Sequence, residues 1–392
     1  MQPCLADLYA NPSSLHREGQ RARSAVERAR EQVAVLVNAH PDEVVFTSGG
    51  TEGDHLAILG AAWAHRADGT RIAISAVEHH AVHGACEVLT DQGWAVDQLS
   101  VGRDGRVEPN AFAPAAGTVL VSMMLANNET GVLQPVEQVA RRAREAGILV
   151  HCDAVQGAGK VALDFRSLGV DYLVVSAHKM SGPKGAGALI TRRGAPLSPL
   201  FRGSGHEGGR RGGTENLPGI VGLGVAAEWA ARDLVAESER LAALRQRLEA
   251  GVRAVAADAV LHGEGAPRLP NTVNVSFPGA RSDHLLMALD ARGIAVSAGA
   301  ACASGAVEPS PVLRAMGVPR AIAICAVRLS IGRTTTAAEV DAVIEALREA
   351  VPAATRVGST AAVGVAGAAA TTGVTAAAAT ATSPRGGPGA LA

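Results

Sequence analysis

Residues 171–190, DYLVVSAHKMSGPKGAGALI, contain the stretch that decides the fold. Its apolar beginning, Tyr172–Ser176, predicts a strand buried on both faces, as in a parallel sheet. Two polar residues, His178 and Lys179, follow directly after Ser176. Ligands of parallel sheets bind beyond the carboxyl ends of the strands, so these residues are candidates for a binding site.

A second segment, HCDAVQGAGK at residues 151–160, places Asp153 and Gln156 just after another apolar strand. We expect the two strand ends to lie on the same edge of the sheet. A carboxylate there would hold a pyridine nitrogen protonated, and the amine of Lys179 would form a Schiff base. Taken singly, Asp153 fits a helix N-cap and Lys179 a solvated loop charge. Their occurrence together favours the cofactor site.

An upstream segment, VVFTSGGTEGDHLAILGAA at residues 44–62, is typical of a strand, a glycine-rich turn and a helix. The turn holds Gly49, Gly50 and Thr51. Free N–H groups at the start of a helix suit a phosphate. An ordinary strand-to-helix turn explains this segment equally well.

Further short β-rich runs alternate with stretches of helical character, which predicts an α/β fold with a mainly parallel sheet covered on both faces. An amphipathic helix is expected from Ser14 to about Asn38. The additional strands are expected at Val44–Thr47, Arg71–Ser75, Thr118–Ser122, Ile148–Cys152 and Ala188–Thr191.

A long charged and alanine-rich stretch, residues 215–256, predicts a helix that links the large domain to a smaller α+β domain. We therefore expect an N-terminal segment (1–14), a large domain (15–250), a small domain (251–352) and a tail (353–392). The small domain would contain strands at Thr272–Phe277 and Ala326–Ile331 and helices at Ser282–Ala291 and about 337–351.

The tail, residues 353–392, consists mainly of Ala, Gly, Thr and Val. It has few large apolar side chains to offset the entropy lost on ordering, so we expect it to be disordered. The uncharged run Val357–Pro384 leaves a membrane anchor as the alternative, although Ala and Thr contribute little to membrane insertion.

Composition narrows the class of protein. The 36 basic and 37 acidic residues nearly cancel, which argues against nucleic acid or membrane as a partner and favours a small-molecule substrate. Five cysteines with no C-x-x-C pair fit neither a disulfide framework nor a zinc site, so we expect a reduced, cytoplasmic protein without a metal. The first residues lack the basic and apolar regions of a secretion signal.

Several dispersed motifs together resemble one family. SAHKMSGPKGAGALI and HCDAVQ are similar to the cofactor segments of class V aminotransferase-fold enzymes, which use pyridoxal phosphate (PLP) and have fold type I with a seven-stranded type of sheet. Within that group the chain resembles cysteine desulfurases of the NifS/IscS type over about residues 11–351. The additional motifs are NPSSLH, FTSGGTE, EHHAV, NNETG, GSGHEGG, RRGGTEN and SAGAACASG.

The resemblance implies a role for each residue that contacts the cofactor ring. Lys179 would form the Schiff base and later move the substrate proton. Asp153 would pair with the pyridine nitrogen, and Gln156 would donate to the phenolate oxygen. His79 matches the histidine that stacks on the ring, while the adjacent His80 has the character of a surface residue.

The resemblance also implies a phosphate site and a homodimer. Gly50, Thr51, Ser176 and His178 match phosphate-binding positions. Thr214 matches a threonine that reaches the phosphate from the neighbouring subunit, so the active sites would be shared.

Substrate recognition and sulfur chemistry follow from the same resemblance. Asn11, Asn128 and Arg328 match residues near the carboxylate of the substrate, and Asn128 also belongs to the cofactor site. By composition alone Cys302 is a buried structural cysteine. By resemblance its thiolate would take the sulfur of L-cysteine as a persulfide, release L-alanine, and pass the sulfur to an acceptor or an iron–sulfur scaffold protein.

The chain also departs from the family pattern. Family members have a strand before the helix in which Met1 lies, and they show S-D-N where this chain has Gly53–His55. Two alternatives therefore stay open: another class V enzyme, such as a selenocysteine lyase or an aminotransferase, and a truncated, non-catalytic relative. Cys302 discriminates against an aminotransferase, which has no use for a thiol at that position.

Overall fold

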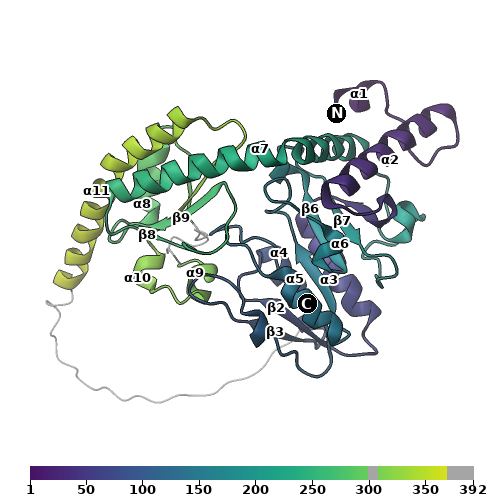
Figure 1. The fold of residues 1–392 in the computed structure, drawn as a ribbon, viewed down its shortest axis with the longest axis horizontal. Coiled ribbons are helices and arrows are strands. Elements are labelled where there is room, and N and C mark those ends of the chain that lie inside the picture. The colour runs from purple at the N-terminus through teal and green to yellow at the C-terminus, as the bar shows by residue number, and fades with distance from the viewer. Residues whose placement is uncertain (299–307, 369–392) are drawn as a thin grey trace, which may run out of the picture.

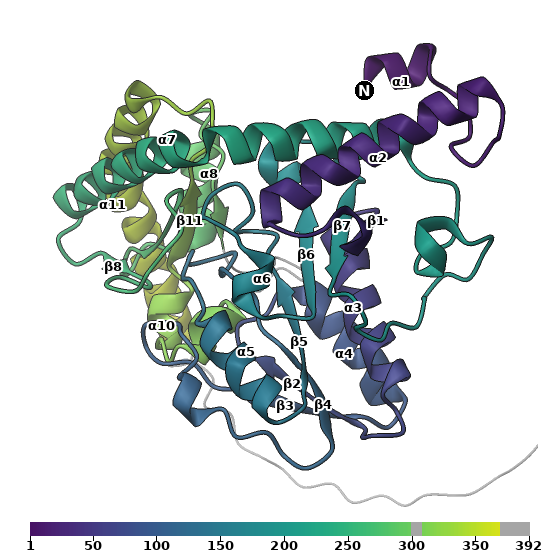
Figure 2. The same ribbon diagram turned by 45° about the vertical axis from the view of Figure 1, so that its right-hand side comes forward.

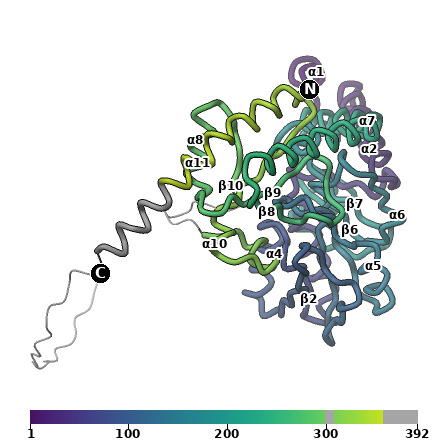
Figure 3. Tube along the Cα trace, turned by 60° about the vertical axis from the view of Figure 1, so that its left-hand side comes forward, coloured from purple at the N-terminus to yellow at the C-terminus, as the bar shows by residue number. Residues whose placement is uncertain are grey.

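The molecule consists of a large and a small part joined by one long helix (Figures 1 and 3). The computed structural model describes residues 1–298 and 308–368, with the backbone alone for 357–368. Cys302 therefore lies outside the described residues.

The large part is built on a seven-stranded sheet with the order β1-β7-β6-β5-β4-β2-β3. The central neighbours β6, β5, β4, β2 and β3 are parallel, whereas β7 runs antiparallel to both β1 and β6. This confirms the predicted α/β class and the mainly parallel sheet. The strands are β1 Val44–Thr47, β2 Arg71–Ser75, β3 Ala95–Leu99, β4 Thr118–Ser122, β5 Leu149–Asp153, β6 Tyr172–Ser176 and β7 Gly187–Thr191.

Helices cover both faces of this sheet because its central strands are apolar on both sides. Figure 2 shows α5 and α6 on one side and α3 and α4 on the other. Alternate residues of β6 serve the two cores: Leu173 and Val175 pack with α2, α5 and α7, while Tyr172 and Val174 pack with α3 and α4. The helices and 3₁₀ turns are α1 Gln2–Ala6, α2 Arg17–Val37, η1 Pro41–Glu43, α3 Gly50–Ala64, α4 His80–Asp91, η2 Pro109–Ala111, α5 Val136–Glu145, α6 Phe165–Leu168, η3 Ala177–Met180 and η4 His206–Gly209.

The small part has its own antiparallel sheet, in the order β10-β11-β9-β8. Its core is formed by one face of this sheet with α8, α11 and the second half of α7. The elements are α7 Leu217–Val255, β8 Val260–Leu261, β9 Thr272–Ser276, α8 Ser282–Asp290, β10 Ser297–Ala298, α9 Pro311–Ala315, α10 Arg320–Ala323, β11 Ala326–Ser330 and α11 Ala337–Ala368.

The helix α7 belongs to both parts. Its 39 residues extend for about 58 Å. Near its beginning, Ile220 and Leu223 pack into the core of the large part. Further along, Leu244 and Leu248 pack into the core of the small part. The expected domain boundary at residue 250 thus falls inside a helix that both cores share.

An arginine of α7 holds the loop that follows the last strand of the small sheet. Arg240 of α7 donates to the carbonyl oxygens of Gly332, Arg333 and Thr335, at 3.0, 3.0 and 2.7 Å. These carbonyls belong to the loop between β11 and α11. The loop that follows Arg328 is therefore held against the helix that also packs on the large sheet.

Some local features differ from the expectations. The helix α1 lies where the resemblance implied one, but the strands β3, β8 and β10 and the short helices α9 and α10 were not predicted. Strand β3 lies at an edge of the sheet, where most of its residues are only partly buried. The helix expected to end near residue 351 continues through Pro352 to Ala368, so disorder from residue 353 was wrong as far as Ala368. Ala354 is buried in the small core, which helps to explain why the helix continues.

No helix in the part of the chain that the structure describes has the length and apolarity needed to cross a membrane.

A buried ion pair fixes the long loop between β7 and α7 to the rest of the large part. The guanidinium of Arg30, on α2, donates to both carboxylate oxygens of Glu207 at 2.8 Å. It also donates to the carbonyl of Val44 at 2.7 Å, and Glu207 accepts from the amide of Phe46 at 2.9 Å. Glu207 keeps a positive φ of 50° in spite of its side chain, which indicates that these contacts determine its position.

We predict that Glu207→Ala lowers the free energy of unfolding by about 3 kcal/mol, because it removes the bidentate partner of the buried Arg30 and leaves only the more exposed Glu27, at 3.1 Å, as its counter-ion. Chemical denaturation of the two proteins measures this difference. The matched control is Asp341→Ala, which removes an exposed ion pair with Arg247 and should leave the unfolding free energy nearly unchanged. Equal effects of the two substitutions would contradict the assignment of Glu207 as an anchor.

Candidate active site

The two predicted strand ends meet at one edge of the large sheet. Strands β5 and β6 are parallel neighbours, and Asp153 at the end of β5 lies opposite Val174 of β6. Two residues further along, β6 ends at Ser176, and η3 carries His178 and Lys179. The parallel pairing therefore brings Asp153 and Lys179 to the same edge, as the sequence predicted.

The surroundings of Asp153 and Lys179 shift the pKa of both groups. Burial, with the charge of Asp54, raises the pKa of Asp153 to about 7, although the amide of Val155 donates to its Oδ1 at 2.9 Å. Burial and the positive charge of Arg328 lower the pKa of Lys179. A lysine that loses its proton more easily is a better nucleophile.

The glycine turn before α3 lies beside these strand ends. Gly49 has φ 154° and ψ −172°, a conformation that favours glycine. A Cβ on Gly50 would lie 3.0 Å from Cγ2 of Val155, and one on Gly187 would lie 2.7 Å from Cα of Gly49. The close packing requires glycine here. The first N–H groups of the fifteen-residue helix α3 are thereby set beside the strand ends.

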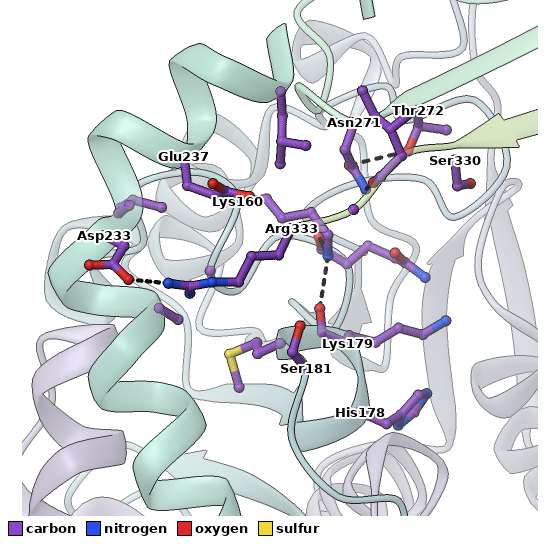
Figure 4. Close-up of a pocket in the computed structure, with 18 of the residues that line it drawn as sticks. Lys160, His178, Lys179, Ser181, Asp233, Glu237, Asn271, Thr272, Ser330 and Arg333 are labelled. Carbon is purple, nitrogen blue, oxygen red and sulfur yellow. Dashed lines mark hydrogen bonds and ion pairs between the residues drawn. The ribbon is translucent and has the colours of Figure 1, made fainter. Parts of the chain in front are cut away.

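A cleft of about 280 Å³ opens between the large and small parts above Lys179 (Figure 4). Of the residues predicted from the sequence, it is lined by Asn128, Gln156, His178, Lys179 and Arg328. Asp153 and Ser176 lie buried beneath it.

Arg328 enters the cleft from the small sheet. Its Nη1 donates to the carbonyl oxygen of Asn128 at 2.8 Å. Its Nε is buried and has no hydrogen-bond partner among the described residues. A guanidinium with an unused buried donor suits an anionic group such as a carboxylate.

Lys160 is a residue of the cleft that the sequence analysis did not identify. Its Nζ donates to the carbonyl oxygens of Gln156 at 2.8 Å and Lys179 at 3.4 Å, so it joins the two segments that carry the site. Burial, with the charge of Lys179, lowers the pKa of Lys160 to about 8. Lys160 lies four residues after Gln156 in HCDAVQGAGK, and this proximity was the sequence feature that could have indicated its place in the cleft.

Two histidines from the motif EHHAV have different surroundings. His79 caps α4, where its Nδ1 accepts from the amide of Ala81 at 3.1 Å. Burial lowers the pKa of His79, and the charges of His80 and Lys179 act in the same direction. His80 is exposed. The structure thus favours His79 over His80 as the histidine near Lys179.

Other predicted residues lie outside the cleft within one chain. Asn11 and Thr214 are exposed and do not line it. Gly50 and Thr51 start α3 at the same sheet edge. Cys302 lies outside the described residues, but β10, which precedes it, pairs with Arg328 through Ser297.

Three buried ionisable residues near Asp153 also escaped the sequence analysis. Asp54 comes from α3, Glu78 from the loop before α4, and His151 from β5. His151 lies two residues before Asp153 and so faces the same side of the sheet. A polar residue at that spacing in an otherwise apolar strand was the signal, whereas nothing in the sequence pointed to Asp54 or Glu78.

Comparisons with known proteins give a consistent result. The family model described as aminotransferase class-V matches residues 1–343. A cysteine desulfurase of Nostoc sp. is 44% identical over 353 residues, covering 90% of this chain and 88% of the relative. A cysteine desulfurase IscS of Anaeromyxobacter sp. is 46% identical over 356 residues, with the same coverage. A solved NifS-like protein superposes with a TM-score of 0.82 at 37% identity, covering 89% of this chain and 93% of that one.

The electrostatic coupling between Arg328 and Lys179 can be tested directly. Arg328→Gln should raise the pKa of Lys179, because it removes a nearby positive charge, and so should slow acylation of this amine at neutral pH. Peptide mass spectrometry of the cofactor-free protein across a pH series measures the acylation, with the exposed Lys184 as internal reference.

Arg333→Gln is the matched control, because Arg333 lines the same cleft but forms an ion pair with Asp233. The coupling would be contradicted if the pH midpoint for acylation of Lys179 stayed unchanged in Arg328→Gln, or if it moved equally in the control.

Proposed function

Because the chain belongs to the aminotransferase class-V family, we propose that it is a PLP-dependent cysteine desulfurase, which converts L-cysteine to L-alanine and holds the sulfur as a persulfide on Cys302. The observation that carries this proposal is the meeting of Asp153 and Lys179 at adjacent strand ends, with Arg328 above them in the same cleft.

The residues present fit PLP. The cofactor requires an amine, an anion for its pyridine nitrogen and donors for its phosphate. Lys179 supplies an amine of lowered pKa, and Asp153 is a buried carboxyl group at the same sheet edge. At the glycine turn the φ of 154° at Gly49 and the tight contact of Gly50 with Val155 favour glycine, and the turn presents the N-terminus of α3.

When bound, PLP serves as an electron sink that stabilises negative charge on the substrate carbons. In our proposal Asp153 holds the proton on the pyridine nitrogen, and Gln156 hydrogen-bonds the phenolate oxygen. His79 packs on the ring, while Gly50, Thr51, Ser176 and His178 bind the phosphate. Lys179, neutral more readily than an exposed lysine, takes the proton from Cα of the substrate and returns one later.

Substrate orientation falls to the residues at the boundary between the two parts. Arg328, whose Nε lacks a partner among the described residues, would bind the carboxylate of L-cysteine together with Asn128. Asn11 would complete this wall. Arg240 holds the loop after β11, and this contact helps to position the end of the strand that carries Arg328.

Sulfur transfer is assigned to Cys302. Its thiolate attacks the sulfur atom of the substrate, a sulfur–sulfur bond forms, and the bond from that sulfur to Cβ breaks. The electron pair of the broken bond stays with the carbon fragment, which takes up a proton and leaves as alanine. The net change is one thiol and one cysteine to one persulfide and one alanine, without an external oxidant.

Further parts of the proposal concern partners and location. We propose that the persulfide sulfur passes to an acceptor such as an iron–sulfur scaffold protein, in the cytoplasm. The near balance of 36 basic and 37 acidic residues gives no general attraction for nucleic acid.

We also propose a homodimer with shared active sites. Thr214 is exposed and does not line the cleft of its own chain. Exposed apolar residues occur in the N-terminal segment and in the loop that leads to Thr214, namely Leu5, Tyr9, Leu15 and Phe201. Both segments lie on the same side of the molecule, at the right of Figure 2.

The function predicts that the purified protein produces alanine and, with a thiol reductant, sulfide from L-cysteine. Cys302→Ser should reduce sulfide production by at least about 10²-fold, because it removes the nucleophile, and should preserve the absorbance of bound PLP. Cys325→Ser, in a buried cysteine outside the cleft, is the control. Sulfide production by Cys302→Ser at the parent rate would show that this role is wrongly assigned.

Shared active sites predict complementation between two inactive variants. Lys179→Ala and Thr214→Ala homodimers should each have low activity, whereas mixed dimers would regain one intact site. We expect about a quarter of the parent activity after the variants are unfolded and refolded together, if subunits pair at random. No recovery in a mixture shown to contain mixed dimers would argue against a shared site.

A further inference from the structure

A cluster of ionisable groups is enclosed beneath the proposed cofactor site. Asp54, Glu78 and Asp153 are 1%, 5% and 6% exposed, and His151 is completely buried. His151 and Asp153 face the same side of β5, and α3, which carries Asp54, packs across that face. Three carboxyl groups and one imidazole thus share a volume from which water is nearly excluded.

These three carboxyl groups cannot all be ionised, because adjacent negative charges in a dehydrated site repel strongly. Burial raises the pKa of Asp54 well above its ordinary value, and the charge of Glu78 adds to the effect. Burial also raises the pKa of Glu78 to about 7. His151 offers no balancing charge, since burial lowers its pKa to about 4 and keeps the imidazole neutral at physiological pH.

The remaining ionisable groups around the cluster are few. The thiol of Cys152, which points to the opposite face of β5, is held neutral because burial raises its pKa. Cys86 on α4 lies near Glu78 and is neutral for the same reason. The charge of Lys179 on η3 lowers the pKa of Asp153 and so favours its ionised form. Of the three carboxyl groups, Asp153 is therefore the one that a nearby lysine stabilises in its charged form.

Hydrogen-bond donors distinguish the three carboxyl groups. Oε1 of Glu78 accepts from the hydroxyl of Ser75 at 2.5 Å and from the amide of Met124 at 2.8 Å. Asp153 accepts from the amide of Val155, as described above. These donors favour the charged forms of Glu78 and Asp153.

Asp54 has no comparable stabilisation. Its Oδ1 has no hydrogen-bond partner among the described residues, and the nearest polar atom given for it is Nε2 of His151 at 3.3 Å. That nitrogen also lacks a hydrogen bond within the described part of the chain. On the other side of the ring, Nδ1 of His151 lies 2.8 Å from the hydroxyl of Ser122.

We propose that Asp54 is a protonated carboxylic acid that donates to Nε2 of His151, and that this neutral pair leaves Asp153 as the charged carboxylate that faces the cofactor. His151 then carries its own proton on Nδ1 and donates it to Ser122. A small movement that shortens the 3.3 Å distance between Oδ1 of Asp54 and Nε2 of His151 would give both atoms a hydrogen bond. The assignment to the cofactor rests on the proposed function, whereas the protonation of Asp54 does not.

The pair gives Asp54 a positioning role. A negative charge at Asp54 would raise the pKa of Asp153. Asp153 would then be less available as an anion. A protonated Asp54 removes that repulsion and also holds the His151 ring against the strand that ends at Asp153.

The test compares full-length parent protein with Asp54→Asn, a neutral isostere, in denaturant unfolding between about pH 5 and 8, with and without added PLP. Because the pKa of Asp54 is raised on folding, the parent takes up a proton when it folds above the ordinary pKa of about 3.9. The stability of the parent thus declines as pH rises towards the folded pKa. Asp54→Asn lacks this decline, so its unfolding constant relative to the parent should fall by up to about tenfold for each unit that the pH rises.

Asp171→Asn is the matched control. Asp171 is also a buried aspartate, but it accepts from the amide of Val150 at 2.8 Å and forms an ion pair with Arg192. Its replacement should destabilise the protein at every pH in this range. If Asp54→Asn behaved like Asp171→Asn, or failed to fold, the proposal would be overturned, because a neutral isostere of a neutral group should be tolerated.

Infrared spectroscopy supplies a second measurement. Above about pH 8, where Glu78 and Asp153 with their pKa of about 7 are largely ionised, the parent should still show the carbonyl stretch of a protonated carboxylic acid. Asp54→Asn should lack this band there, while Asp171→Asn retains it. Asp54→Asn should also keep the absorbance spectrum of added PLP, whereas Asp54→Ala, which cannot donate to His151, should alter it. Absence of the carbonyl band from the parent would contradict the proposal whether or not the protein binds PLP.

Discussion

The parallel pairing of β5 with β6 is the constraint on which the site depends. Two strands that are apolar on both faces align side by side, so the polar residues that follow them emerge together at the carboxyl edge. Asp153 and Lys179 belong to segments that are separated in the sequence, yet the register of β5 with β6 brings their backbones to the same edge of the sheet. The helices on both faces then exclude water from Asp153 and raise the pKa of its carboxyl group.

Much of this arrangement was predictable, because strong local patterns carry it. The buried strands, the glycine turn and the long helix are recognisable from runs of apolar residues and from their boundaries. The edge strand β3 was not, since its partly buried residues alternate weakly. Alanine is a good helix former, so the composition permitted a longer α11. The continuation was missed because composition alone does not show that Ala354 has a core to pack into.

The contacts that escaped the sequence analysis join residues far apart in the chain. Asp54, Glu78 and His151 belong to three different elements, and each alone has the character of an ordinary polar residue. Their significance arises from burial, which is a property of the assembled sheet and helices. Conversely, Asn11 and Thr214 match family motifs but do not line the cleft of their own chain. For Thr214, a second subunit provides the physical reason we propose.

The packing of α2 against α7 has a consequence for the folding of this protein during its synthesis. The two helices stand on the same face of the large sheet, yet all seven strands of that sheet lie between them in the sequence. During synthesis α2 leaves the ribosome early, and the part of its apolar stripe that packs on α7 stays uncovered until α7 has emerged. Nascent chains with such uncovered surface are prone to aggregate. From the order of the elements we therefore expect the growing chain to be more prone to aggregate than the finished protein.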